Sequence, residues 1–148
     1  MALLAGCGPL PQTAQQFREQ FPGSFIGSVQ TLEVDRPYQD VSKTFQAKAS
    51  ECLYVSVRSD IVTTYKPTVV VGDKRTELHL QRRYDGDVIN LYKEPEGGQY
   101  VLVADATPLP ANRTKVDIYG LWRGVGAVVK AITAWANGNT GCPDMTKN

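Results

Sequence analysis

The feature that most constrains the fold is a long stretch of two-residue alternation between Leu53 and Tyr119. Apolar and polar residues alternate along its segments, which is the pattern of strands with one buried face. Turn signals such as Asp85-Gly86 and Gly97-Gly98 separate these segments at intervals of about 8–14 residues and predict an antiparallel meander. Together with an earlier alternating segment, the pattern predicts strands at 28–34, 53–58, 68–71, 77–84, 88–92, 100–104 and 114–119.

Two segments have helical periodicity instead. An apolar stripe predicts a helix over 37–51 with Asp35 as its N-cap, and another predicts a helix over 122–137 that ends at Asn137-Gly138. Gly124 and Gly126 make the first turn of the second helix irregular, through crowding against the sheet or, alternatively, close approach to a ligand. We expect an α+β fold, in which an antiparallel sheet of about six or seven strands packs in two layers against these helices.

This order of elements resembles the helix-grip arrangement of START-like and polyketide-cyclase-like domains. The segment Val34-Asp35-Arg36-Pro37-Tyr38-Gln39-Asp40-Val41 is similar to the strand-to-helix opening of those families. The resemblance covers residues 28–137 and implies a curved sheet wrapped around the last helix. Those domains usually carry a second helix after the first, whereas here Cys52 leads directly into a predicted strand.

The N-terminus carries a possible targeting motif. Leu4-Ala5-Gly6-Cys7 resembles the lipobox that ends the signal peptide of bacterial lipoproteins. The resemblance implies that Cys7 becomes the first residue of the mature chain and is acylated. Gly8, and not Asp, would then be the second residue, which by analogy with that family favours the outer membrane of the bacterial cell envelope.

Only six residues precede Cys7, and none of them is basic. An export signal needs a basic segment followed by an apolar run of about 7–15 residues. We therefore expect the complete signal to begin upstream of Met1. The alternative is a chance match at the start of a cytoplasmic protein.

If the motif is a lipobox, it divides the chain into three parts. Residues 1–7 would be the remnant of the signal with the acylated cysteine, and residues 8–24 a tether with a short, weakly packed helix. Residues 25–148 would form the single α+β domain. No apolar run reaches the roughly 18 residues that span a bilayer, so membrane attachment depends on the lipid at Cys7.

The chain has three cysteines, an odd number that needs an explanation in an exported protein. If Cys7 is acylated, Cys52 and Cys142 remain as a pair. An oxidising periplasm would allow them to form a disulfide that ties the last helix to the end of the first. The alternative is two unrelated buried thiols.

Composition and motifs argue against several function classes. The net charge of +1 gives no basic field for nucleic acid. His79 is the single histidine, and it lies on the polar face of a predicted strand, where exposure to solvent is expected rather than a catalytic role. The chain has no CxxC motif, so we expect no metal site. We also expect no cofactor and no enzymatic activity.

Aromatic residues leave one binding function open. Tyr100, Tyr119, Trp122 and Trp135 are candidates for lining a cleft between the sheet and the last helix, although such residues also build ordinary cores. The sequence thus favours a lipid-anchored envelope lipoprotein with an interaction or structural role, in which a protein of the envelope is the possible partner. The alternative is a periplasm-facing protein that binds a hydrophobic small molecule or lipid in this cleft.

Overall fold

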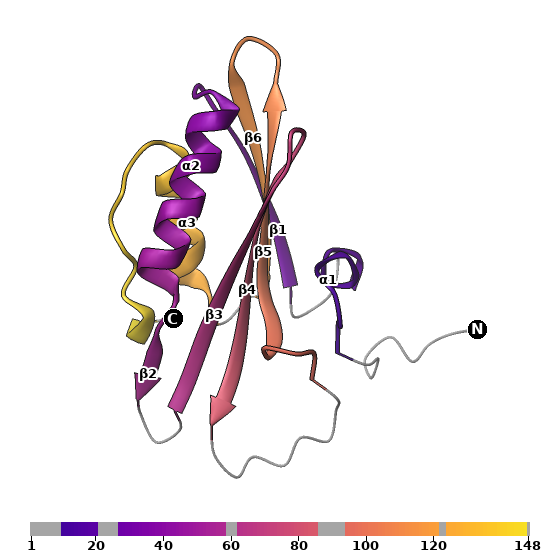
Figure 1. The fold of residues 1–148 in the computed structure, drawn as a ribbon, viewed down its shortest axis with the longest axis vertical. Coiled ribbons are helices and arrows are strands. Elements are labelled where there is room, and N and C mark those ends of the chain that lie inside the picture. The colour runs from indigo at the N-terminus through magenta and orange to yellow at the C-terminus, as the bar shows by residue number, and fades with distance from the viewer. Residues whose placement is uncertain (1–9, 21–26, 59–61, 86–93, 122–123, 148) are drawn as a thin grey trace, which may run out of the picture.

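A computed structural model describes residues 10–20, 27–58, 62–85, 94–121 and 124–147. This part of the chain contains six strands and three α-helices (Figure 1). In chain order they are α1 (Ala14–Gln20), β1 (Gly27–Val34), α2 (Tyr38–Lys48), β2 (Ser56–Arg58), β3 (Val62–Val71), β4 (Thr76–Asp85), β5 (Gln99–Leu109), β6 (Arg113–Leu121) and α3 (Gly126–Ala136). A π-helical turn (Ala49–Leu53) extends α2, and a short 3₁₀ helix (Met145–Lys147) lies near the C-terminus.

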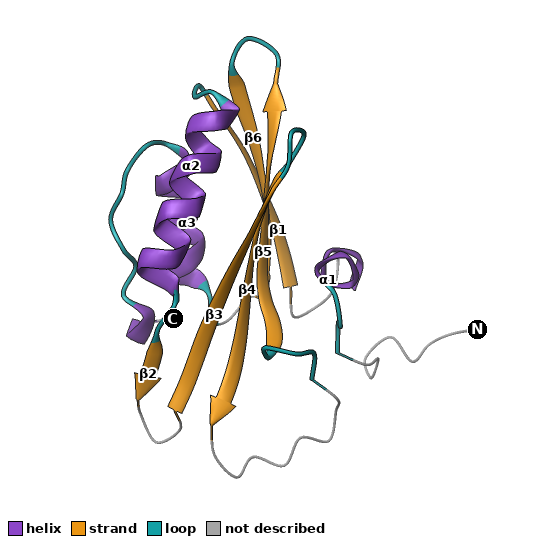
Figure 2. Cartoon of the chain, in the orientation of Figure 1, coloured by secondary structure: helices purple, strands orange, loops and turns teal. Residues whose placement is uncertain are grey.

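The strands form one antiparallel sheet in the order β1-β6-β5-β4-β3-β2. The meander β2 to β6 follows the chain, and β1 returns to pair with the last strand, so Val34 lies opposite Thr114. This arrangement confirms the predicted α+β class and the antiparallel sheet of about six strands (Figure 2). The predicted strand at 88–92 lies outside the described residues, and β4 has β3 and β5 as its neighbours.

The helices α2 and α3 cover one face of the sheet (Figure 1). Their apolar stripes meet side chains that point to the same face from alternate positions of the strands, and together they form the main core. Its fully buried members include Val41 and Phe45 of α2, Val128, Ile132 and Trp135 of α3, and Leu78, Leu80, Leu102 and Ile118 of the sheet.

The opposite face of the sheet carries α1 (Figure 1). Phe17 is completely buried against Val103 of β5, and Ala14 belongs to the same cluster. The expectation of a weakly packed N-terminal helix is therefore wrong. Because side chains alternate along β5, Leu102 faces α2 and α3 whereas Val103 faces α1, and the second face acquires an apolar cluster of its own.

The junction between β1 and α2 connects several elements. Asp35 is not the N-cap of α2, because Pro37 occupies that position and no side chain caps the helix. The Asp35 carboxylate instead accepts a hydrogen bond from Nε of Arg113 at 2.8 Å. Arg36 donates from Nη1 to the carbonyl oxygens of Trp135 at 3.0 Å and Ala136 at 3.2 Å, and thereby binds the C-terminal end of α3.

Candidate functional site

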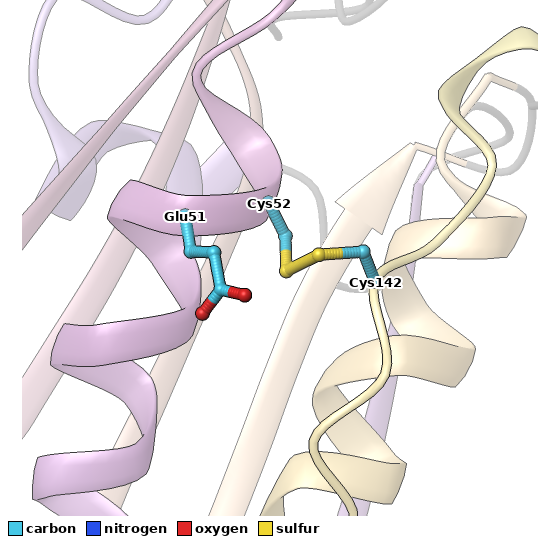
Figure 3. A group of neighbouring side chains, drawn as sticks. All are labelled: Glu51, Cys52 and Cys142. Carbon is cyan, nitrogen blue, oxygen red and sulfur yellow. A yellow bond between two sulfur atoms is a disulfide. The ribbon is translucent and has the colours of Figure 1, made fainter.

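A disulfide joins Cys52 and Cys142, with 5.2 Å between their Cα atoms (Figure 3). Cys52 lies in the π-helical turn that extends α2, and Cys142 lies in the segment that follows α3. The bridge fastens the C-terminal segment to the end of α2, as predicted from the cysteine arithmetic. Trp135 adds a second link on this side, because its Nε1 donates to the carbonyl oxygen of Gly141 at 2.8 Å.

The carboxylate of Glu51 lies beside this disulfide (Figure 3). Its oxygen and the two sulfur atoms lie within 4.8 Å of one another, which is close enough for a shared metal ion. Cysteine binds metals as a free thiolate, however, and both sulfur atoms are used in the covalent bond. Glu51 instead forms an ion pair with Lys48 at 2.8 Å. The two cysteines therefore act as a covalent cross-link and not as metal ligands.

The structure separates the four aromatic residues proposed for a ligand cleft. Trp135 of α3 is fully buried in the main core. Tyr100 and Tyr119 pack against Phe17 and its neighbours on the α1 face of the sheet, so they do not line a space between the sheet and α3. Trp122 lies outside the described residues. The prediction of one shared cleft is therefore wrong for these two tyrosines, because strand alternation turns Tyr119 to the opposite face and the register shift between Leu80 and Gln81 does the same for Tyr100.

An ionic cluster lies under α1 and is the most elaborate polar arrangement in the described part of the chain. The guanidinium of Arg18 binds both carboxylate oxygens of Asp105, with 2.7 Å from Nε to Oδ2 and 2.8 Å from Nη2 to Oδ1. Its Nη2 also donates to Oε1 of Glu77. The side chains of Arg18 and Asp105 are only 9% and 6% exposed, so this is a buried, charge-assisted contact between α1 and β5.

His79 extends the cluster along β4. Its Nε2 lies 3.0 Å from Oε1 of Glu77, and its ring makes an edge contact with Tyr100 at a centroid distance of 6.1 Å. The side chain is 13% exposed, so the expectation of a solvent-exposed histidine is wrong. Within the described residues, no serine or cysteine side chain forms a hydrogen bond with His79.

The charges of the cluster shift the protonation equilibria of its members. Burial by itself raises the pKa of Glu77, but the hydrogen bonds from Arg18 and His79 and the charges of Arg18 and Arg75 lower it from 4.5 to about 2. Burial opposes the charge of Arg18 as well, yet its two carboxylate partners raise the pKa of the guanidinium. Burial and the negative charges of Asp117 and Asp105 raise the pKa of Tyr119. Arg18 and Glu77 therefore remain ionised at neutral pH.

The cluster fits a positioning role for α1. Arg18 and Phe17 are consecutive residues of one short helix, and they insert a charge and an aromatic ring into neighbouring places on the sheet. The guanidinium and the two carboxylates are one another's hydrogen-bond partners. Local periodicity does not predict this cluster, although Asp105 stands out as a charged residue in the otherwise apolar run 101–106.

The structure also has an open surface hollow at the β3–β4 turn. It is lined largely by polar and charged side chains, and it lies at a different place from the predicted cleft. The lining residues are Gly72, Asp73, Lys74, Arg75, Glu77 and Thr107.

No protein-family model matches this sequence, and comparison with curated proteins gives no significant match. Among the described helices, none is both long enough and apolar enough to cross a membrane.

Proposed function

We propose that this chain is a lipid-anchored lipoprotein of the bacterial cell envelope, attached at the outer membrane through Cys7. Its α+β domain acts as a non-enzymatic interaction or structural module. The observation that carries the proposal is the combination of the lipobox-like Leu4-Ala5-Gly6-Cys7 with the disulfide between Cys52 and Cys142. The membrane, through the lipid, and a protein of the envelope are the expected partners.

The pairing of the cysteines supports export. Disulfides persist in oxidising compartments such as the periplasm and are rare in the bacterial cytoplasm. With Cys52 and Cys142 joined, Cys7 is the one cysteine left over from the three in the chain. Acylation of Cys7 would account for this third cysteine and would leave no free thiol in the mature protein.

The docking of α1 supports a close association between domain and membrane. Seven residue steps separate Cys7 from Ala14, the first residue of α1. A fully extended chain covers about 3.3–3.6 Å per residue, so a lipid on Cys7 holds the start of α1 within about 25 Å of the bilayer surface. Because Arg18 and Phe17 fix α1 to the sheet, this reach limits how far the domain can move from the bilayer.

The packing between sheet and helices favours an interaction module over a carrier of hydrophobic ligands. Trp135, Ile132 and Leu102 are all fully buried in the layer between α3 and the sheet. Large side chains thus occupy the space that a bound lipid would need in the alternative function. A lipid that repeatedly co-purifies in a defined ratio with the detergent-extracted protein would favour that alternative.

The test of the anchor is Cys7→Ser in the precursor expressed with its native upstream sequence. The variant should move from the membrane fraction to the soluble fraction, because no acyl chain can be attached. The double variant Cys52→Ser/Cys142→Ser is the matched control, since it removes two cysteines but keeps Cys7 and should remain with the membrane. An unchanged distribution of Cys7→Ser would refute the proposal.

A further inference from the structure

The strand β1 forms one edge of the sheet. It pairs with β6 on one side, and within the described residues no strand lies on its other side. The four residues 28–31 are exposed. An edge strand of this kind presents a row of backbone donors and acceptors that can pair with another extended chain.

The edge at β1 lacks the features by which proteins usually protect an edge strand. The register with β6 runs without a bulge over all eight residues of Gly27–Val34. The strand contains no proline and no lysine, and its one charged residue, Glu33, forms an ion pair with Arg113 at 3.2 Å. Short length, proline, lysine and bulges are the usual obstacles to strand addition.

The opposite edge of the sheet is protected. It is formed by the three residues of β2 (Ser56–Arg58), which pair with Val62–Thr64, and beyond Thr64 by β3 itself. This free part of β3 contains Pro67, which cannot donate a backbone hydrogen bond. The sheet therefore has one edge that resists pairing and one that permits it.

The sequence of β1 is compatible with pairing to itself. Antiparallel pairing of two copies about a twofold axis normal to the sheet can place Gln30 opposite its own counterpart. Val29 then faces Thr31, and Glu33 faces Gly27. No like charges meet across this pairing, and a β-branched pair lies on the face that carries α1.

The same symmetry suits attachment of both copies to one membrane. A twofold axis normal to the sheet keeps each α1 on the same face of the joined sheet. With strands about 4.8 Å apart, the two β5 strands are five spacings, or about 24 Å, apart, which leaves room for two helices about 10 Å wide. Both copies of α1 then lie on one face, which is the face that α1 occupies for a single copy in Figure 1.

We infer that β1 is a self-association edge, through which two copies of this chain join their sheets by antiparallel β1–β1 pairing centred on Gln30. The inference deepens the proposed function, on which its membrane geometry rests, because it identifies the partner as a second copy. The edge supplies the backbone hydrogen bonds, and co-anchoring in one bilayer raises the effective concentration of the partner.

The test uses charge substitutions at the symmetry axis in the full chain. Gln30→Lys and Gln30→Glu each place two like charges opposite each other, so each variant alone should associate at least tenfold more weakly than the unaltered protein. An equimolar mixture of the two should recover association, because unlike charges then meet. Thr68→Lys, an exposed charge on β3, is the matched control and should associate normally.

Association is measured by sedimentation equilibrium of the detergent-solubilised full chain, and circular dichroism verifies that each variant is folded. A monomer at every concentration up to the millimolar range would overturn the inference, and so would a dimer that both Gln30 variants leave intact. Neither result depends on acylation, which is read separately from the intact mass. Failure of the edge and failure of the lipid anchor are therefore distinguishable.

Discussion

Arg18 of α1 binds both carboxylate oxygens of Asp105 in β5, with distances of 2.7 and 2.8 Å. The contact joins residues that are 87 positions apart in the sequence. It connects the segment that would lead to the membrane anchor with a central strand of the sheet. Because both side chains are nearly buried, water cannot solvate either charge if its partner is removed.

Replacing Arg18 with methionine should therefore destabilise the fold strongly. The methionine side chain keeps part of the apolar volume but leaves Asp105 buried without its cation, which costs about 3–5 kcal/mol. Urea unfolding at pH 7 measures this free energy. Gln20→Ala, an exposed position of the same helix, should change it by less than about 0.5 kcal/mol.

A double-mutant cycle separates the ion pair from the packing of α1. Arg18→Met combined with Asp105→Asn should cost less than the sum of the two single substitutions, since each single change leaves an uncompensated charge. Strict additivity of the two free energies would contradict the coupling that the structure shows.

The low pKa of Glu77 predicts a specific pH dependence. Because its folded-state pKa is about 2, below the ordinary 4.5, the ionised carboxylate stabilises the fold at every pH above about 4.5. This contribution is lost as the pH falls through 2. Glu77→Gln should thus be less stable than the unaltered protein by about 1–2 kcal/mol at pH 7, allowing for partial exposure, and the difference should shrink towards pH 2.

Unfolding in urea at pH 7, 4.5, 3 and 2 follows this difference. Glu33→Gln is the matched control, because Glu33 is half-exposed in its ion pair with Arg113 and should show little effect. A constant difference between Glu77→Gln and the unaltered protein across this range would refute the assignment.

Loss of the disulfide should destabilise the domain by about 2–4 kcal/mol, because the bridge closes a loop with a sequence separation of 90. Cys52→Ser/Cys142→Ser and reduction of the unaltered protein should have the same effect in thermal unfolding. Cys7→Ser should leave the free energy of unfolding unchanged. Reaction of two thiols in Cys7→Ser protein that has never been reduced would contradict the bridge.

Arg36 should stabilise α3, although the two are far apart in the sequence. Its guanidinium donates to the carbonyl oxygens of Trp135 and Ala136 in the last turn, and the Trp135 carbonyl also accepts from the backbone N–H of Gly138 at 3.0 Å. Arg36→Met should cost about 1–2 kcal/mol through these lost hydrogen bonds. Hydrogen exchange localises the effect, and faster exchange is expected in the last turn of α3.

The main layers of the fold were predictable from local periodicity. The stripe through Val41 and Phe45 indicated α2, and the alternation around Leu78 and Leu80 indicated β4. Strand lengths were less predictable: β3 extends back to Val62 through a segment without clear alternation, because pairing with β4 overrides local preference.

The candidate site was far less predictable, since it depends on contacts across the sequence. To predict the interaction of Arg18 with Asp105, one must know that α1 packs on the second face of the sheet. A seven-residue helix gives only a weak periodic signal for this. Tyr100 was assigned to the wrong face because a bulge between Leu80 and Gln81 shifts the alternation of the neighbouring strand. The disulfide was predictable because counting cysteines needs no geometry.

The most direct test of the central claim is the mass of the N-terminal peptide of the protein extracted from bacterial membranes. The precursor is expressed with its native upstream sequence, and the peptide is analysed by tandem mass spectrometry. We predict a peptide that begins at Cys7 and carries a diacylglyceryl group on Sγ. A peptide that extends through an unmodified Cys7 would contradict the lipid anchor.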